Sequence, residues 1–321
     1  MRYLLRRLLH SVYLLAGVSV LCFLFTDLAP GNFFDEMKLS PQISPNTVAA
    51  LKTQYGLNRP LPVRYLLWVK SVVRGEWGFS FAYNSPVWDL LAVRAKNTLL
   101  LTGVATILAW LIAVPLGVGM AYWRGSWADH LGMGGTSLLL SLPELVLALG
   151  LLYFAVRTHS LPVGGMSALN GESYTFLSRL RDRLAHLVIP VATLVVGSLP
   201  LLVRHVRASM IEVLDAPFIQ AVRGHGVTPA RTLFVYALPA AANPLISLLG
   251  FSVGGLLGAS LLVEVIMGWP GVGPLLLEAT MARDLYIVIG AVMISTLFMI
   301  AGNLLADALL IALDPRVRTR A

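Results

Sequence analysis

The chain has 321 residues, of which 57% are hydrophobic and only 12% are charged, with a formal net charge of +8. Soluble domains carry about twice that charged fraction, so the composition excludes one water-soluble core and indicates a polytopic membrane protein. The positive charge comes without any block of Lys or Arg, which argues against nucleic-acid binding and is explained by anionic lipid headgroups.

Six apolar stretches are long enough to cross a hydrocarbon core, which takes about 20 helical residues. The first follows the basic start "MRYLLRR" and no A-x-A cleavage pattern comes after it, so we interpret it as an uncleaved span rather than a signal peptide. The sequence therefore predicts an all-α integral membrane fold with six transmembrane helices. The predicted spans lie near 8–28, 97–123, 131–156, 185–203, 240–267 and 285–313.

The arginines predict the orientation. If both termini are cytoplasmic, eleven Arg lie on the inner side and five lie in the short outer loops. This distribution follows the positive-inside rule, which discounts long loops. The long segment 29–96 holds the remaining eight Lys and Arg, and counting it would reverse the majority. We expect both termini, including the tail 314–321, to be cytoplasmic.

The external segment 29–96 contains the patterns of short amphipathic helices. "SPNTVAALKTQYG" and "PVRYLLWVKSVVRG" each place apolar residues at helical spacing and end at a glycine. Trp68, Trp77 and Trp88 suit a membrane interface. We expect surface helices that form a packed cap rather than a separate ligand-binding domain. The second outer loop, 267–284, is rich in Gly and Pro before a short helical pattern.

Glu144 lies near the middle of the third predicted span, directly after Pro143. A charge there costs roughly 2.5–3.5 kcal/mol on insertion scales, so the carboxylate should face a cavity or a partner. Two interpretations stay open. Glu144 is either a polar group in a translocation path or a hydrogen-bonded contact between helices.

Other constellations favour packing over catalysis. "GFSVG" matches G-x-S-x-G around Ser252, but a nucleophile elbow needs a strand-to-helix turn, and this stretch is inside the fifth span. Gly250, Gly254 and Gly258 repeat every four residues and share one helix face, as in small-xxx-small packing. The six histidines form no i, i+4 pair, so no metal site is predicted.

The loop 204–239 carries the most specific pattern. Asp215 is the expected N-cap of a short helix that has Pro217 in its first turn, and Gly224 and Gly226 end it. Thr228 and Pro229 start a second helical pattern. Two short helices with a glycine break cannot cross a bilayer, so we expect both to lie on its cytoplasmic face.

This loop resembles the EAA motif of ABC importer permeases, E-A-A-x3-G-x9-I-x-L-P. Aligned on its glycine, the motif places Gln220, Ala221 and Val222 at the E-A-A positions, and Leu238 and Pro239 match outright. The missing Glu and the Val are departures from the motif. The resemblance implies that the loop couples the chain to an ATPase, through Phe218, Gln220, Ala221, Val222, Arg223, Gly224, His225, Gly226, Leu238 and Pro239.

Four further segments resemble the dipeptide/oligopeptide/nickel branch of these permeases. They are "YLLRRLLHSVYLL…FLFTDLAPG", "YGLNRPLPVRYLLWVKSVVRGEWGFSF", "GWPGVGPLLLEATMARD" and "LLIALDPRVR". Their order and spread, from the first span to the C-terminus, extend the resemblance over the whole chain. Residues 97–313 would then form the ABC transmembrane domain.

The resemblance implies a transport subunit rather than an enzyme. Such a subunit forms half of a pathway for peptides in a prokaryotic inner or plasma membrane. Its implied partners are a second, homologous permease, two ATPase subunits that bind ATP and Mg²⁺, and an external binding protein. No Lys follows a Gly, so the chain has no P-loop and we expect no cofactor in it. Alternatives are a permease for nickel, glutathione or oligosaccharide and, more distantly, an ATP-independent channel or carrier.

Overall fold

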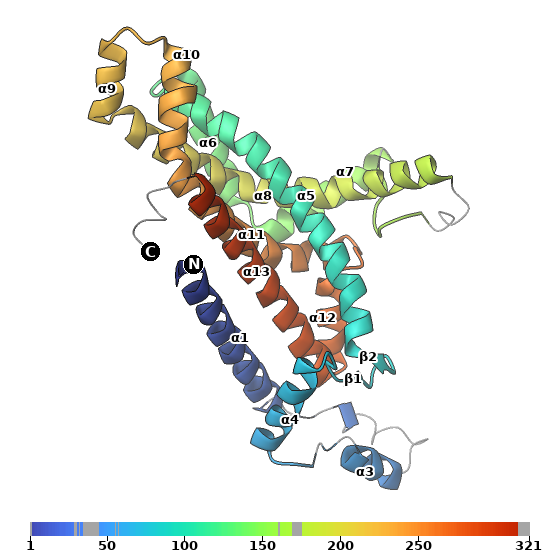
Figure 1. Ribbon diagram of the computed structural model, residues 1–321. Coiled ribbons are helices and arrows are strands. Elements are labelled where there is room, and N and C mark those ends of the chain that lie inside the picture. Colours follow the sequence, from blue (N-terminus) through green and yellow to red (C-terminus); the bar gives the residue numbers. More distant parts are fainter. Residues whose placement is uncertain are drawn as a thin grey trace. The chain divides into compact units, whose positions relative to one another are not determined.

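The computed structural model describes residues 2–28, 31, 33–34, 45–54, 56, 58–159, 161–168 and 175–313 (Figure 1). The predicted tail 314–321 and parts of the external segment lie outside this range. The elements in chain order are α1 (Arg2–Leu28), α3 (Pro45–Gln54), α4 (Leu61–Val73), β1 (Phe79–Ser80), β2 (Ser85–Pro86), α5 (Val87–Tyr122), α6 (Trp127–Ser141), α7 (Glu144–Thr158), α8 (Phe176–Leu214), α9 (Pro217–Gly224), α10 (Pro229–Arg231), the π-helix η2 (Thr232–Ala237), α11 (Leu238–Ile266), α12 (Val272–Met281) and α13 (Leu285–Leu313).

The predicted all-α membrane fold is confirmed. Five helices in the described part are long and apolar enough to cross a bilayer, and one bent pair makes a sixth candidate span. The long helices extend beyond the apolar stretches from which the spans were predicted. α8, for example, covers 39 residues and contains Pro190 and Pro200, whereas the apolar pattern predicts a span only over 185–203.

The third predicted span is not one helix, which corrects the continuous span near 131–156. It consists of α6 and α7, bent by 96° at their junction. Leu142, which precedes Pro143, is extended with ψ of 121°. The proline ring disfavours helical geometry at the residue before it, so α6 ends there and a new helix starts.

The structure divides into two compact units, and the first comprises residues 1–98 and 270–298. Its core joins α1, α4 and the start of α13 through Phe23, Trp68, Ile289 and Met293. The β1–β2 hairpin is fixed by Asp284, whose Oδ2 accepts hydrogen bonds from Ser80 Oγ at 2.7 Å and from the Ala82 amide at 3.1 Å.

A second contact of this hairpin joins its turn to α12. The Tyr83 hydroxyl donates a hydrogen bond to Glu278. Burial and this hydrogen bond raise the pKa of Tyr83 to about 12, so the phenol stays protonated across the neutral range.

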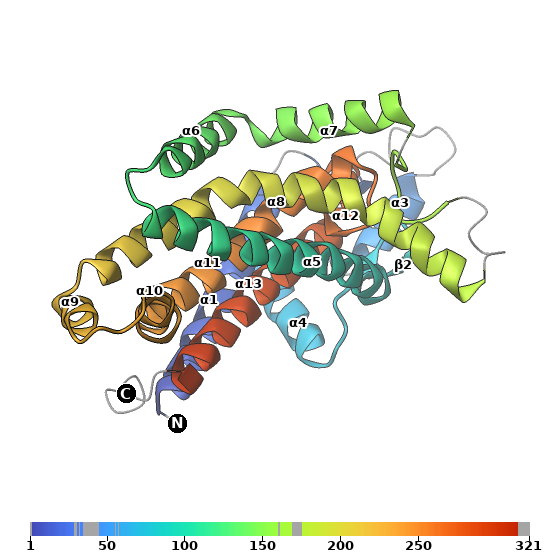
Figure 2. The same cartoon turned by 90° about the horizontal axis from the view of Figure 1, so that it is seen from above.

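The second unit comprises residues 99–269 and 299–321 and contains most of the helical bundle. One buried cluster runs between α5, α7, α8 and α11 and includes Leu101, Leu194 and Leu256. Another gathers Val118, Val206 and Met210. Figure 2, which views the molecule along a second direction, agrees with Figure 1 in placing α9 past the end of α8 and beside α10.

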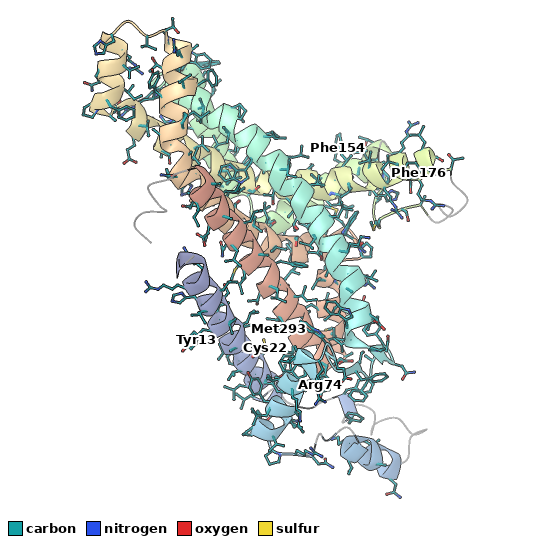
Figure 3. All side chains as sticks on the ribbon, in the orientation of Figure 1. Tyr13, Cys22, Arg74, Phe154, Phe176 and Met293 are labelled. Carbon is teal, nitrogen blue, oxygen red and sulfur yellow. The ribbon has the colours of Figure 1, made fainter. Side chains whose placement is uncertain are left out.

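Many large apolar side chains project outward from the helices, as Figure 3 shows for Tyr13, Phe154 and Phe176. These three side chains are 80%, 60% and 84% exposed. Apolar exposure on this scale would promote aggregation in water but matches a helix surface in contact with acyl chains.

Candidate functional site

The candidate coupling segment is α9, a helix of eight residues that follows directly on α8. Pro217 stands in its first turn, where a missing amide hydrogen breaks no helical bond. The helix ends at Gly224, and the His225 amide still donates to the Ala221 carbonyl at 3.0 Å. Gly226 follows with φ of +75°, a left-handed conformation that favours glycine. The backbone therefore turns where the glycine pattern predicts.

The apolar residues of α9 divide between two faces. Ile219 is fully buried and packs in the same cluster as Met210, Leu214 and Ala237. Phe218 is 47% exposed, and Ala221 on the same side is exposed as well. One isoleucine thus anchors the helix to the bundle and an aromatic side chain stays available to a partner. The coupling residues expected from the sequence do not include Ile219, the anchor of the helix.

Asp215 does not cap α9, which corrects that expectation. α8 continues to Leu214, Asp215 ends it, and Ala216 precedes α9 without a side-chain cap. The Asp215 carboxylate instead accepts a hydrogen bond from Arg124 Nη1 at 2.9 Å. Asp215 keeps helical backbone angles at the end of α8, and Ala216 lies between it and Pro217, so Ala216 takes the extended N-cap position.

The second short helix is also not separate, which corrects the pair of helices expected on the cytoplasmic face. Thr228 is the N-cap residue as predicted, but Pro229–Ile266 form one helical stretch of 38 residues. Its π-helical part pairs the Leu238 amide with the Leu233 carbonyl, five residues back. Pro239 lacks an amide hydrogen, which helps to explain the wider turn at this point. Leu238 and Pro239 therefore lie inside the stretch that continues into the fifth span.

A buried ion pair fixes the start of α6 to α8 in the same unit as α9. Arg207 Nε and Nη2 donate to the two carboxylate oxygens of Asp129 at 2.6 and 2.7 Å. The Gly125 amide donates to Oδ2 at 2.9 Å, and the Ser126 side chain caps the helix by accepting from the Asp129 amide. The side chain of Asp129 is only 5% exposed and that of Arg207 20%. This bidentate geometry makes a rigid joint.

A second arginine, one helical turn before Arg207 on α8, reinforces this joint. Arg204 Nε donates to Thr136 Oγ1 at 3.1 Å, and its Nη2 contacts Ser137 Oγ. Arg204 and Arg207 are two of the eleven inner-side arginines, for which the sequence predicted orientation alone. Their partners are 67 to 78 positions away, and no local spacing pattern signals such a pair.

Glu144 is the first residue of α7, at the bend, rather than in the middle of a continuous helix. A carboxylate at a helix N-terminus interacts favourably with the helix dipole. The side chain is half-buried, and a methyl group built on Gly197 would lie 4.0 Å from its Oε1. The bend thus brings a carboxylate next to a glycine of α8, at a break in the bundle.

Two of the three small-residue positions lie against α13. A Cβ at Gly250 would come 2.8 Å from the Ala306 Cβ, and one at Gly254 would come 3.0 Å from Met299. Gly258 is exposed and a Cβ there would meet nothing within 4 Å, which corrects the packing expectation for this residue. Two of the three glycines on this face, Gly250 and Gly254, therefore allow α11 and α13 to approach closely.

Ser252 lies inside α11, where a nucleophile elbow would require a turn after a strand. Its hydroxyl donates to the Leu249 carbonyl at 2.8 Å and accepts from the Trp110 indole nitrogen at 3.0 Å. Among the described residues, no group of three or more His, Cys, Asp or Glu is placed to hold a metal ion.

The sequence matches two family models that together cover nearly the whole chain. Residues 113–319 match the inner membrane component of binding-protein-dependent transport systems, and residues 1–102 match the N-terminal part of such membrane components. The fold is similar to a chain of the MetNI methionine ABC transporter in an inward-facing conformation. That match has a TM-score of 0.53 at 20% identity and covers 68% of this chain and 95% of the other.

Several relatives match over almost their full length. The oligopeptide transport system permease protein AppB of Bacillus subtilis is 35% identical over 318 residues, which is 98% of each chain. The dipeptide permease DppB of Escherichia coli K12 is 32% identical over 341 residues, 99% of each. The glutathione permease GsiC of Salmonella paratyphi A is 31% identical over 320 residues, again 99% of each.

Proposed function

The chain belongs to the family of inner membrane components of binding-protein-dependent transport systems, and from this premise we propose that it is the permease subunit of a peptide importer. It is a multi-pass protein of the inner membrane and works with ATPase subunits. The oligopeptide and dipeptide permeases among its relatives support peptides as the cargo. Because a glutathione permease has a similar identity to this chain, the tripeptide glutathione is the nearest alternative cargo.

The role of α9 follows from one observation. An eight-residue helix is anchored by the fully buried Ile219 and presents Phe218 and Ala221 outward. If an ATPase groove binds the Phe218 ring, a displacement of α9 would be transmitted through Ile219 to the helices against which Ile219 packs. Arg223 and His225 then supply polar contacts, and Gly226 supplies the turn.

Movement of α9 has a short route into the bundle. α9 joins α8 through Asp215 and Ala216, and the Asp129–Arg207 pair joins α8 to α6. ATP-driven closure of the ATPases would displace α9, and the packed helices of this unit would follow as a rigid body between inward-open and outward-open states.

The assembly we propose contains a second, homologous permease, two ATPase subunits and an external binding protein. The test is uptake of labelled di- and oligopeptides into proteoliposomes that contain both permeases and both ATPase subunits, with the binding protein supplied outside. We expect uptake only with ATP and binding protein present, and competition by peptides rather than by nickel or oligosaccharide. Solute movement by the isolated chain, without any ATPase, would contradict the proposal.

Glu144 has a separate test. We propose that its carboxylate, at the bend between α6 and α7, faces the translocation path. Glu144→Gln keeps the shape and removes the charge, and we expect it to change the relative uptake of cationic and anionic peptides. Glu212→Gln, at an exposed position of α8, is the matched control. Unchanged selectivity in Glu144→Gln would leave the carboxylate with a packing role only.

A further inference from the structure

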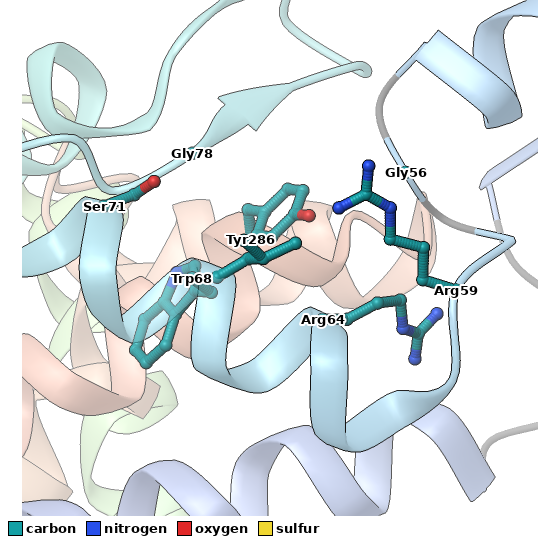
Figure 4. Close-up of a pocket in the computed structure, with 8 residues that line it drawn as sticks. Gly56, Arg59, Arg64, Trp68, Ser71, Gly78 and Tyr286 are labelled. Atoms are coloured by element: carbon teal, nitrogen blue, oxygen red, sulfur yellow. The ribbon is translucent and has the colours of Figure 1, made fainter.

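The first unit contains a pocket that the transport proposal does not use. Its cavity of about 250 Å³ is lined by residues from α4, from the loops before and after it, and from the first turn of α13. Figure 4 labels the side chains that give the pocket its chemistry, which are Arg59, Arg64, Trp68, Ser71 and Tyr286.

The polar groups of this pocket are suited to an anion. Within the described residues, the lining includes two guanidinium groups and two hydroxyls but no carboxylate. Arg64 forms an ion pair with Asp27 outside the lining, yet its Nε is buried and has no hydrogen-bond partner among the described residues. That Nε is closed off from solvent, so the exposed guanidinium of Arg59 is the donor that an anion entering the pocket can reach.

The charge balance favours an anion with one negative charge. Asp27 neutralises Arg64, whereas Arg59 is exposed and makes no ion pair within the described residues. The pocket therefore carries about one net positive charge from its described groups. A phosphodiester has one negative charge and accepts the paired donors of an arginine.

The backbone at Gly78 approaches the Tyr286 ring closely. Gly78 has φ of +104°, and a Cβ there would lie 2.8 Å from the Tyr286 ring. The chain can approach this ring so closely only at a glycine. In Figure 4 the Tyr286 hydroxyl is turned toward the Arg59 guanidinium. A ligand atom between the two would receive donors from both sides.

The surface of α4 next to the pocket is apolar. Val63, Leu66 and Leu67 have the spacing of one helix face and are 41%, 66% and 43% exposed. The opposite face of α4 packs through Trp68 and Tyr65 against α1 and α13, both of which belong to spans. Leucines exposed beside the end of a membrane span are in the right place to meet acyl chains.

We propose that this pocket binds the phosphate of an anionic glycerophospholipid, with an acyl chain along the Val63–Leu67 face of α4. The Arg59 guanidinium holds the phosphate oxygens, and the Tyr286 hydroxyl donates to one of them. With both termini cytoplasmic, the lipid belongs to the outer leaflet. The site would connect α4 to the outer ends of α1 and α13 through a ligand.

The test measures lipid retention by the full chain in its purified transporter complex. The complex is washed with detergent, supplied with phosphatidylglycerol or phosphatidylcholine, and examined by native mass spectrometry. We expect preferential retention of phosphatidylglycerol, because the choline cation of the other lipid would approach Arg59. Arg59→Gln should weaken this retention roughly tenfold or more through the loss of a charge-assisted bond.

Arg74→Gln is the matched control, since Arg74 is an exposed arginine at the end of α4 outside the pocket lining. It should retain the lipid like the unchanged chain. Equal retention of both lipids, or equal losses in Arg59→Gln and Arg74→Gln, would overturn the proposal. An arm with inorganic phosphate separates the sources. If inorganic phosphate raises the melting temperature of the complex as much as phosphatidylglycerol does, the site binds a dissolved anion and the lipid assignment is wrong.

Discussion

Removal of the Asp129 carboxylate should loosen the joint between α6 and α8. Asp129→Ala leaves the Arg207 guanidinium without its two bonds of 2.6 and 2.7 Å and leaves the Gly125 amide without its acceptor. Breaking a buried pair by removing one partner costs about 3–5 kcal/mol. The Arg207 side chain is 20% exposed and can recover some hydration, so we expect a loss near the lower end, about 3 kcal/mol.

The chain provides a matched control in the Arg124–Asp215 pair. This pair has a similar N–O distance of 2.9 Å, but its side chains are 58% and 67% exposed. Exposed pairs contribute about 0–1 kcal/mol, so Asp215→Ala should change stability little. The assay is thermal unfolding of the purified complex in detergent. We expect the apparent melting temperature to fall several times further for Asp129→Ala than for Asp215→Ala.

A double-mutant cycle isolates the interaction energy of the pair. Arg207→Ala combined with Asp129→Ala should cost less than the sum of the two single changes, because the second change removes the stranded charge. If Asp129→Ala is as mild as Asp215→Ala, or if the two changes add without coupling, the reasoning about a rigid joint is wrong.

Two further predictions each compare the same added methyl group at two glycines. Gly226→Ala should cost about 1–2 kcal/mol because of its left-handed backbone, and it should lower transport-coupled ATPase activity, whereas Gly224→Ala at the end of α9 should be tolerated. Gly250→Ala should lower the melting temperature through contact with α13, whereas Gly258→Ala, which meets open space, should not. Equal effects within either pair would contradict the corresponding geometry.

The sequence allowed the membrane class and the approximate location of the spans to be predicted, because apolar stretches of about 20 residues have few other uses. It did not indicate where helices continue past these stretches. An apolar pattern ends where charged residues begin, but a helix can continue through them. α8 includes charged residues at both of its ends. The break at Leu142 was accessible from the proline that follows it, by a local rule that hydropathy ignores.

The candidate site was predictable only in its local features. The turn at Gly226 and the position of Pro217 in the first turn depend on residues next to each other in sequence. The partners of Ile219 and Asp129 depend on packing between helices that are far apart in the chain, so neither the anchor nor the joint could be predicted. Asp215 shows the same limit, because α8 continues to Leu214 and keeps Asp215 at its C-terminal end, where it cannot cap α9.

The most direct test of the central claim is a cross-link from α9 to the ATPase. The single cysteine is first removed by Cys22→Ser, and Phe218→Cys then carries a photoreactive label in the assembled complex. Phe176→Cys, at the other end of α8 and also exposed, is the control for labelling without contact. The account predicts that the ATPase subunit is cross-linked from position 218 and not from 176. A complex that transports peptide but gives no ATPase cross-link from position 218, or an equal one from 176, would contradict it.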